Sequence, residues 1–327
     1  MNIPTSANGS RATIVTLTMN PALDITTNVD WVRPTDKLRC QVPRHDPGGG
    51  GINVARVASV LGASASAVFP AGGPTGDVVA ELLVAEGVPF HRVKIGGRTR
   101  ESFTVNEECS GQQYRFVLPG PPLTFAERAQ CVDQLRAAAD SAQFVVVSGS
   151  LPPGVPADFY QQIADVCGDL GTRLVLDTSG TGLRHIPSGV FLLKPSVREL
   201  RECVGRELVG ESDQTAAAQE LVQQGRAQVV VVSLGDRGAL LVTPTAAERV
   251  SAIKMRSGSG VGAGDAMVAA ITVGLSRGWP LSKSVRFGVA AGAAMLMTPG
   301  TAVCNRADVE RLFGLVADPA DLSAVSG

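Results

Sequence analysis

Short apolar runs alternate with helical patterns along most of the chain. Residues 12–19 (ATIVTLTM) and 66–72 (SAVFPAG) predict buried strands, and helical patterns follow them at 51–62 and 75–87. Four later runs predict further strands, at 144–150, 173–180, 189–196 and 227–235. These runs are continuously apolar, which is typical of strands covered on both faces. The fold class predicted is therefore α/β, with a doubly wound, mainly parallel sheet and helical crossovers.

Two segments, at about 24–45 and 98–118, interrupt this alternation. Each combines alternating strand patterns with turn residues and contains no helical pattern. They predict a small β-sheet that is inserted into the main domain and projects from it as a lid. The sequence contains no linker, repeat or low-complexity tract, so a single domain is expected over 12–316, with flexible tails at 1–11 and 317–327.

Composition narrows the classes of function. The 29 basic and 30 acidic residues nearly balance, so neither a general nucleic-acid binder nor a membrane-surface binder is indicated. The six cysteines are scattered without a C-x-x-C pair, which favours reduced thiols in a cytoplasmic protein. The apolar stretch at 287–304 contains Pro299 and internal glycines, so a buried helix is expected there and not a membrane span.

Two glycine-rich stretches stand before helical patterns. The first, DPGGGGINVARVASVLG at 46–62, could be a phosphate cradle, a dinucleotide turn, a linker, or backbone that touches a small polar ligand. The second, GSGVGAGDAMVAAITVGL at 258–275, follows a predicted strand at 252–257. Free N–H groups and small residues at a helix start make an anion site there, with Asp265 in the first helical turn. That position favours the carboxylate and predicts a weaker base.

Polar residues also cluster where the predicted strands end, which predicts a cleft at the carboxyl edge of the sheet. They are Asp24, Ser148, Ser150, Asp177, Lys194, Ser233 and Gly235. The motif G-x-x-x-x-G-K-[ST] of phosphate loops, the hydrolase motif G-x-S-x-G and the zinc motif H-E-x-x-H are all absent. Three scattered histidines offer neither a catalytic triad nor a metal cluster.

Ordered motifs from about residue 12 to 316 resemble those of the ribokinase-like (PfkB) carbohydrate kinases. They are, in chain order, PGGGGINVAR, SGSLPPG, LDTSG, KPSVREL, VSLGDRGAL and GVGAGDAMVAA. Within this family KLRC, PGGGG, TRE and YRFVLPG look like the branch that phosphorylates fructose 6-phosphate. The resemblance implies a ribokinase-like fold and ATP-dependent 6-phosphofructokinase activity on the 1-hydroxyl, yielding fructose 1,6-bisphosphate. Fructose 1-phosphate and tagatose 6-phosphate kinases, and a weakly active sugar-phosphate-binding regulator, are the alternatives.

The resemblance also implies roles for individual residues. Asp265 would be the catalytic base, and the amides of Gly262, Ala263 and Gly264 would stabilise charge on the transferring phosphoryl group. The residues implied in binding the sugar hydroxyls are Asp24, Gly49, Gly50, Asn53 and Asp177. Those implied in binding the substrate phosphate are Lys37, Arg100, Arg115 and Ser150.

For the nucleotide, the family pattern implies binding by Lys194, Ser196, Ser233, Gly235 and Gly238. Glu199 matches the acid linked to Mg²⁺, and the lid strands would form a homodimer contact. The chain departs from the family pattern at three places. At two of them, Ser196 and Gly260 stand where an Asn and a Thr are usual. The segment 298–302 also lacks the N-x-G-x-R associated with a monovalent cation, so potassium activation is left open.

Overall fold

The computed structural model describes residues 13–185, 188–255, 260–298 and 302–322. Its main element is a ten-stranded sheet in the order β14-β13-β12-β11-β10-β9-β8-β1-β4-β5, parallel from β11 to β5 and antiparallel from β11 to β14. The strands are β1 Ile14–Leu17, β4 Ala65–Ala71, β5 Phe90–Lys94, β8 Phe144–Ser148, β9 Arg173–Asp177, β10 Val190–Leu193, β11 Ala227–Ser233, β12 Gly238–Val242, β13 Ala247–Ser251 and β14 Ala320–Asp321.

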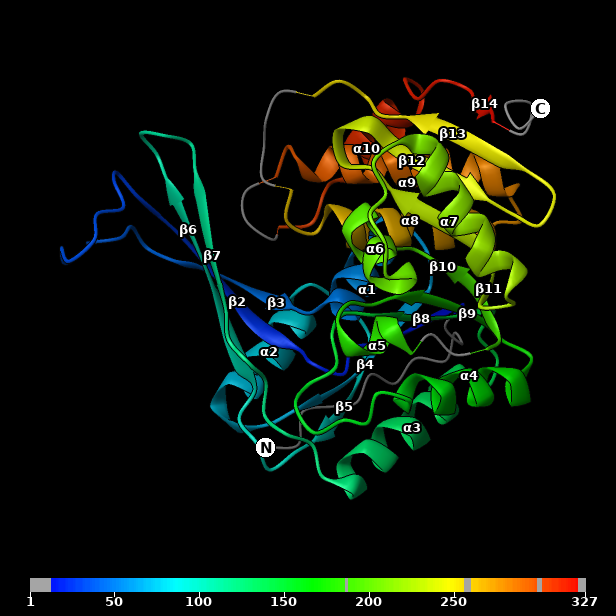
Figure 1. Cartoon of the computed structure of the whole chain (residues 1–327). Coiled ribbons are helices and arrows are strands. Elements are labelled where there is room, and N and C mark those ends of the chain that lie inside the picture. The colour runs from blue at the N-terminus through cyan, green and yellow to red at the C-terminus, as the bar shows by residue number, and fades with distance from the viewer. Residues whose placement is uncertain (1–12, 186–187, 256–259, 299–301, 323–327) are drawn as a thin grey trace.

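Helices cover both faces of this sheet (Figure 1), which confirms the predicted doubly wound α/β class. One core lies under α3 Phe125–Ala139, α4 Phe159–Leu170, α5 Thr181–Arg184, α6 Val197–Val204 and α7 Glu211–Gln223. The other lies under α1 Gly50–Val60, α8 Ala263–Ser276, α9 Leu281–Met295 and α10 Arg306–Phe313. Along β8, Phe144 and Val146 enter one core while Val145 and Val147 enter the other. This is why the apolar run is continuous.

The two segments without helical pattern form a separate four-stranded sheet, here called the lid sheet, in the order β3-β2-β6-β7. It consists of β2 Ala22–Val29, β3 Arg44–Gly48, β6 Arg100–Glu107 and β7 Gln113–Val117. The central pair β2–β6 is parallel and the two outer pairs are antiparallel. The lid sheet extends away from the main sheet (Figure 1), as the sequence predicts. Its base packs on α2 Gly73–Ala85.

Several boundaries differ from the sequence prediction. The strand expected at 252–257 is wrong for 252–255, because the strand in this region is β13, which ends at Ser251. The C-terminal tail expected from residue 317 includes β14, which pairs with β13. The N-terminal tail expected at 1–11 lies outside the described residues.

The first half of the apolar stretch at 287–304 belongs to helix α9 (Leu281–Met295), which is buried along most of its length. Gly288 lets it pack closely against α8, because a Cβ at this position would lie 2.6 Å from Ile271 Cγ1 and 3.0 Å from the Met267 carbonyl oxygen. No helix within the described residues meets the length and hydropathy needed to cross a bilayer.

Candidate active site

Asp265 lies in the first turn of α8, where three elements meet. Its two carboxylate oxygens accept hydrogen bonds from Asn53 Nδ2 on α1 at 2.9 Å and from Ser148 Oγ at the end of β8 at 3.1 Å. Burial raises the pKa of Asp265, although the bonds from Asn53 and Ser148 and the charge of Lys194 oppose that rise. The weaker base expected at a helix start is therefore wrong, because desolvation of the carboxylate raises the pKa of Asp265 overall.

A buried ion pair stands beside Asp265. Lys194, just beyond β10, places its Nζ 3.1 Å from an oxygen of Asp177 at the end of β9. Burial raises the pKa of Asp177 to about 6 while Lys194 lowers it. Burial disfavours the Lys194 ammonium, but Asp177 and Glu199 raise its pKa overall. The position of a Cβ on Gly264 would lie 3.7 Å from Lys194 Nζ, so this cation stands at the start of α8.

Asp24 lies on β2 where the lid sheet meets the main sheet, paired across the strands with Asp46 on β3. Burial raises its pKa to about 6, and the charges of Arg100 and Arg115 partly offset the rise. These two cations therefore lie close enough to Asp24 to influence it. The sequence predicts all three at one substrate site, and the lid sheet places them together.

The guanidinium of Arg100 is already held by two backbone carbonyl groups. Its Nη1 donates to the carbonyl of Leu118 at 3.0 Å and its Nη2 to that of Asn20 at 2.9 Å. Within the described part of the chain its buried Nε lacks a partner. Arg100 thus joins β6 to the chain after β7 and after β1, and burial lowers its pKa while Asp24 raises it.

The glycine run at 48–51 has a packing explanation. A Cβ on Gly48 would come within 2.6 Å of Asp24 Oδ1, and one on Gly51 within 2.6 Å of the Leu17 carbonyl oxygen. A Cβ on Gly50 would overlap Ser148 Oγ and lie 2.8 Å from Gly149 N. Gly49 has φ +112°, which L side chains rarely adopt. Close approach of α1 to β8 and β1 therefore requires glycine at positions 50 and 51, and contact of β3 with Asp24 leaves no room for a side chain at Gly48, whether or not a sugar is bound.

The second glycine run forms the start of α8, although residues 258–259 lie outside the described residues. Gly262 is the N-cap residue and has φ +75°, so glycine suits it. The Ala263 N–H donates to the Gly260 carbonyl at 3.2 Å. One of the three amides implied to stabilise the phosphoryl group, that of Ala263, thus closes a turn in this structure.

The residues matched to the nucleotide also have local structural roles. Ser196 and Glu199 form a reciprocal capping box at the start of α6, with Ser196 Oγ donating to Glu199 Oε2 at 2.8 Å. Serine therefore caps this helix where the family pattern has Asn. Ser233 N donates to the Pro195 carbonyl at 2.9 Å. Gly235 and Gly238 both have positive φ, at +64° and +100°, in the turn between β11 and β12.

Lys37 is exposed in the segment between β2 and β3, which projects with the lid sheet (Figure 1). In the described part of the chain, no hydrogen bond or ion pair joins it to Asp24 or Arg100. Ser150 accepts a hydrogen bond from Asn20 Nδ2 at 3.2 Å. The segment 298–302 compared with a cation site lies mostly outside the described residues, at 299–301.

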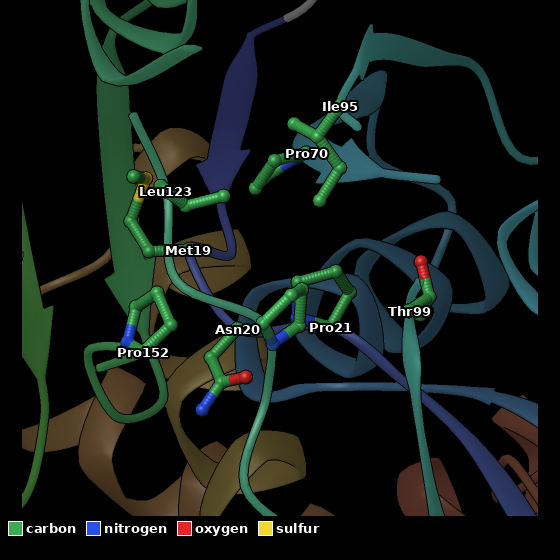
Figure 2. A pocket seen from close by; sticks show the side chains of 9 residues that line it. Met19, Asn20, Pro21, Pro70, Ile95, Thr99, Leu123 and Pro152 are labelled. Carbon is green, nitrogen blue, oxygen red and sulfur yellow. The ribbon is translucent and has the colours of Figure 1, made fainter. Parts of the chain in front are cut away.

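Asn20 lies beside the candidate site, where it donates to Ser150, and was not among the residues that the sequence analysis selected. It lines a small pocket with Met19, Pro21, Thr99 and Pro152 (Figure 2), and its Oδ1 is buried without a partner among the described residues. It follows β1 closely, so the strand-end rule that selected Ser148 and Asp177 would also have selected it. Ser148 was noted for its place but not given a role, and the structure shows that it contacts Asp265.

The comparisons with known proteins agree with this geometry. A family model described as pfkB family carbohydrate kinase matches residues 17–308. The chain is 66% identical over 322 residues to the ATP-dependent 6-phosphofructokinase isozyme 2 of Mycobacterium tuberculosis, covering 98% of this chain and 95% of that protein. It is 42% identical over 306 residues to the isozyme 2 of Escherichia coli, covering 93% and 99%.

The solved structure of phosphofructokinase-2 from Escherichia coli in complex with fructose-6-phosphate superposes with a TM-score of 0.87 at 41% identity, covering 93% of this chain and 99% of that one. Other structures of the same protein are described as a complex with potassium and as a tetrameric inhibited form.

Proposed function

The chain belongs to the pfkB family of carbohydrate kinases, and we propose that it is an ATP-dependent 6-phosphofructokinase. The acceptor would be the 1-hydroxyl of fructose 6-phosphate, and the products fructose 1,6-bisphosphate and ADP. One observation carries the proposal: a partly buried carboxylate, Asp265, stands at a helix start between two hydrogen-bond donors and beside a buried lysine, Lys194. The identity to named 6-phosphofructokinases over nearly the whole chain supports the choice of substrate.

In this mechanism Asp265 accepts the proton of the 1-hydroxyl as that oxygen bonds to the γ-phosphorus of ATP. The bond from the γ-phosphorus to the bridging oxygen breaks, and ADP leaves with the electron pair. Asn53 and Ser148 hold both oxygens of Asp265, so the carboxylate is oriented before the substrate arrives. The raised pKa of Asp265 makes it a stronger base than an exposed aspartate.

The start of α8 and Lys194 would stabilise the negative charge of the transferring phosphoryl group. The Gly262 and Gly264 amides belong to this region, and Ala263 would join them once its turn to Gly260 opens. The other nucleotide contacts proposed are those of Ser196, Ser233, Gly235 and Gly238.

The sugar side of the site would be formed by the main sheet and the lid sheet together. Asp24, Asn53, Asp177 and the backbone of Gly49 and Gly50 are proposed for the hydroxyls. Arg100, Arg115, Ser150 and Lys37 are proposed for the 6-phosphate, where guanidinium groups suit a dianion. The influence of Arg100 and Arg115 on Asp24 supports their place near the sugar.

The oxygen donors near Lys194 suit Mg²⁺, which binds few protein ligands when phosphates supply the rest. Glu199 uses one oxygen, Oε2, in the capping box, and its charge acts on both Asp177 and Lys194. It is therefore the residue proposed to hold the ion, which when bound neutralises phosphate charge. Among the described residues there is no group of three or more His, Cys, Asp or Glu side chains that could hold a metal ion.

A homodimer through the lid sheet is proposed from its exposed apolar side chains. Phe103, Phe116 and Val117 are 37%, 55% and 61% exposed on β6 and β7. Burying them against a second copy would remove apolar surface from water. Because a structure of the Escherichia coli relative is described as a tetrameric inhibited form, the mass in solution should be measured to distinguish a dimer from a tetramer.

A coupled ADP-release assay tests the proposed function with fructose 6-phosphate, fructose 1-phosphate and tagatose 6-phosphate. Preferred turnover of fructose 6-phosphate with Mg-ATP is expected, measured in potassium and in sodium buffers because a relative binds potassium. Preference for either other sugar would reassign the substrate. If the protein binds these sugar phosphates but phosphorylates none of them, it is a sugar-phosphate-binding regulator and not a kinase.

A further inference from the structure

Arg56 is a fully buried arginine that neither the substrate nor the nucleotide is proposed to touch. It lies on α1, one turn after Asn53, and its side chain is 1% exposed. Such burial is rare for arginine and requires partners for its donors. Glu86, just after α2, accepts from Arg56 Nε and Nη2 at 2.6 Å each.

The other donors of Arg56 face the active site and the lid sheet. Arg56 Nη1 donates to the Asn53 side-chain oxygen Oδ1 at 3.4 Å and to the Pro47 carbonyl at 3.2 Å. Arg56 Nη2 also reaches Asp46 Oδ1 at 3.4 Å, and both Asp46 and Pro47 belong to β3 of the lid sheet. One guanidinium therefore links α2, the lid sheet and the amide that holds Asp265.

The nitrogen and the oxygen of the Asn53 side-chain amide contact groups of opposite charge. Its NH₂ group donates to Asp265 Oδ2 at 2.9 Å, while its oxygen accepts from Arg56. Rotating the amide by half a turn would put its oxygen against a carboxylate and its NH₂ group against a guanidinium. Both new contacts would be repulsive, so Arg56 and Asp265 together select one orientation.

We propose that Arg56 is a positioning residue of the kinase reaction: it orients the Asn53 amide toward Asp265 and couples that orientation to lid strand β3. This inference rests on the proposed function, because it assigns Asp265 the role of base. Glu86 supplies a countercharge to the buried guanidinium. The lid sheet shares the same guanidinium through Asp46 and Pro47.

The consequence is a change in the titration of the base. The bond from Asn53 lowers the pKa of Asp265, so an unheld amide leaves that pKa higher. The other charged groups that act on Asp265 are Lys194, which lowers its pKa, and the carboxylates of Asp24 and Asp177. They are unchanged in the variants below. The acid limb of the kcat profile should therefore move to higher pH.

The test is Arg56→Lys in the full-length enzyme, assayed for kcat, KM and melting temperature from pH 5 to 9. Lysine keeps the charge but cannot reach Glu86, Asn53 and Pro47 at once. We expect kcat to fall roughly tenfold to a hundredfold, KM for ATP to stay within about twofold, and the acid limb to rise by about one pH unit.

Two further variants separate positioning from stability. Glu86→Gln weakens the same ion pair but leaves Arg56 facing Asn53, so the melting temperature should fall with no shift of the acid limb. If Arg56→Lys does not fold, Arg56→Met with Glu86→Met removes the buried cation together with its main countercharge. This pair should show the same rise of the acid limb.

A double-mutant cycle with Asn53→Ala completes the test. If Arg56 acts through Asn53, adding Arg56→Lys to Asn53→Ala should lower kcat no further than about twofold. Provided that the wild-type enzyme turns over fructose 6-phosphate, either of two results would overturn the inference. The first is a double mutant whose loss of kcat equals the product of the two single losses. The second is an Arg56→Lys enzyme that is less stable but keeps the acid limb of the wild type. Failure of wild-type turnover would instead refute the proposed function.

Discussion

Replacing Gly50 by alanine distinguishes two reasons for the glycine run. A Cβ at this position would lie 2.8 Å from both Gly149 N and the Ser148 carbonyl carbon, besides overlapping Ser148 Oγ. Favourable contact between such atoms begins at about 3.5 Å, so backbone of α1 or β8 must shift by several tenths of an ångström. If Gly50 is needed for packing, Gly50→Ala will lower the stability of the protein even when no ligand is bound.

The magnitude follows from two opposing effects. Overpacking a well-filled site costs about 1–3 kcal/mol, while alanine gains up to about 1 kcal/mol over glycine in a helix and less at its first residue. We expect a net destabilisation of about 1–2 kcal/mol, which lowers the melting temperature by a few degrees. Since Ser148 Oγ also donates to Asp265, kcat should fall as well.

The assay is thermal and urea denaturation of the ligand-free protein, followed by steady-state kinetics. Gly168→Ala in α4 is the matched control, because a Cβ there meets no atom within 4 Å. That substitution should stabilise the protein by about 0.5–1 kcal/mol. A Gly50→Ala protein that melts like the wild type but has a raised KM for fructose 6-phosphate would refute the packing explanation and favour a role limited to sugar contact.

Three further outcomes are expected. Asp265→Asn should lower kcat by about 10²–10⁴-fold with little change in substrate binding measured by calorimetry, and near-normal turnover would remove Asp265 as the base. Arg100→Ala should raise KM for fructose 6-phosphate far more than for fructose, and equal effects on both would contradict a phosphate contact. Asp24→Asn should raise the melting temperature at pH 7. The pKa of Asp24 is about 6 in the folded protein, above the 3.8 of an unperturbed aspartate, so its ionisation at pH 7 disfavours the folded state. That gain should fade as pH falls from about 6 towards 4, and a gain that persists at pH 4 would contradict the assigned cause.

Much of the fold was predictable from local patterns. The runs at 144–150, 173–180 and 227–235 became β8, β9 and β11, since continuous apolar side chains favour a strand between two helical layers. The two stretches without helical pattern became the lid sheet for a similar local reason. The strand expected at 252–257 failed because pairing with β12 selected Ala247–Ser251 instead.

The candidate site was predictable only in part. Strand-end position identified Asp177 and Lys194, which the sheet then brought to 3.1 Å. Asn20 directly follows the predicted strand at 12–19 and fits the same rule, but it was not among the residues selected. The capping box of Ser196 and Glu199 is a local S-x-x-E pattern and could have been predicted from the sequence. The family resemblance implies ligand roles for the same two residues.

The sequence by itself determined the alternation of strands and helices, the inserted lid and the residue types at the strand ends. These depend on neighbours a few positions apart, where periodicity and turn chemistry act. Only the tertiary structure decided the sign of the Asp265 pKa shift, the packing need for the glycines and the link from Arg56 to the base. Those depend on contacts such as Asn53 to Asp265 and Ser148 to Asp265, which join residues 212 and 117 positions apart. Burial and charge at such distances exist only once the chain has folded.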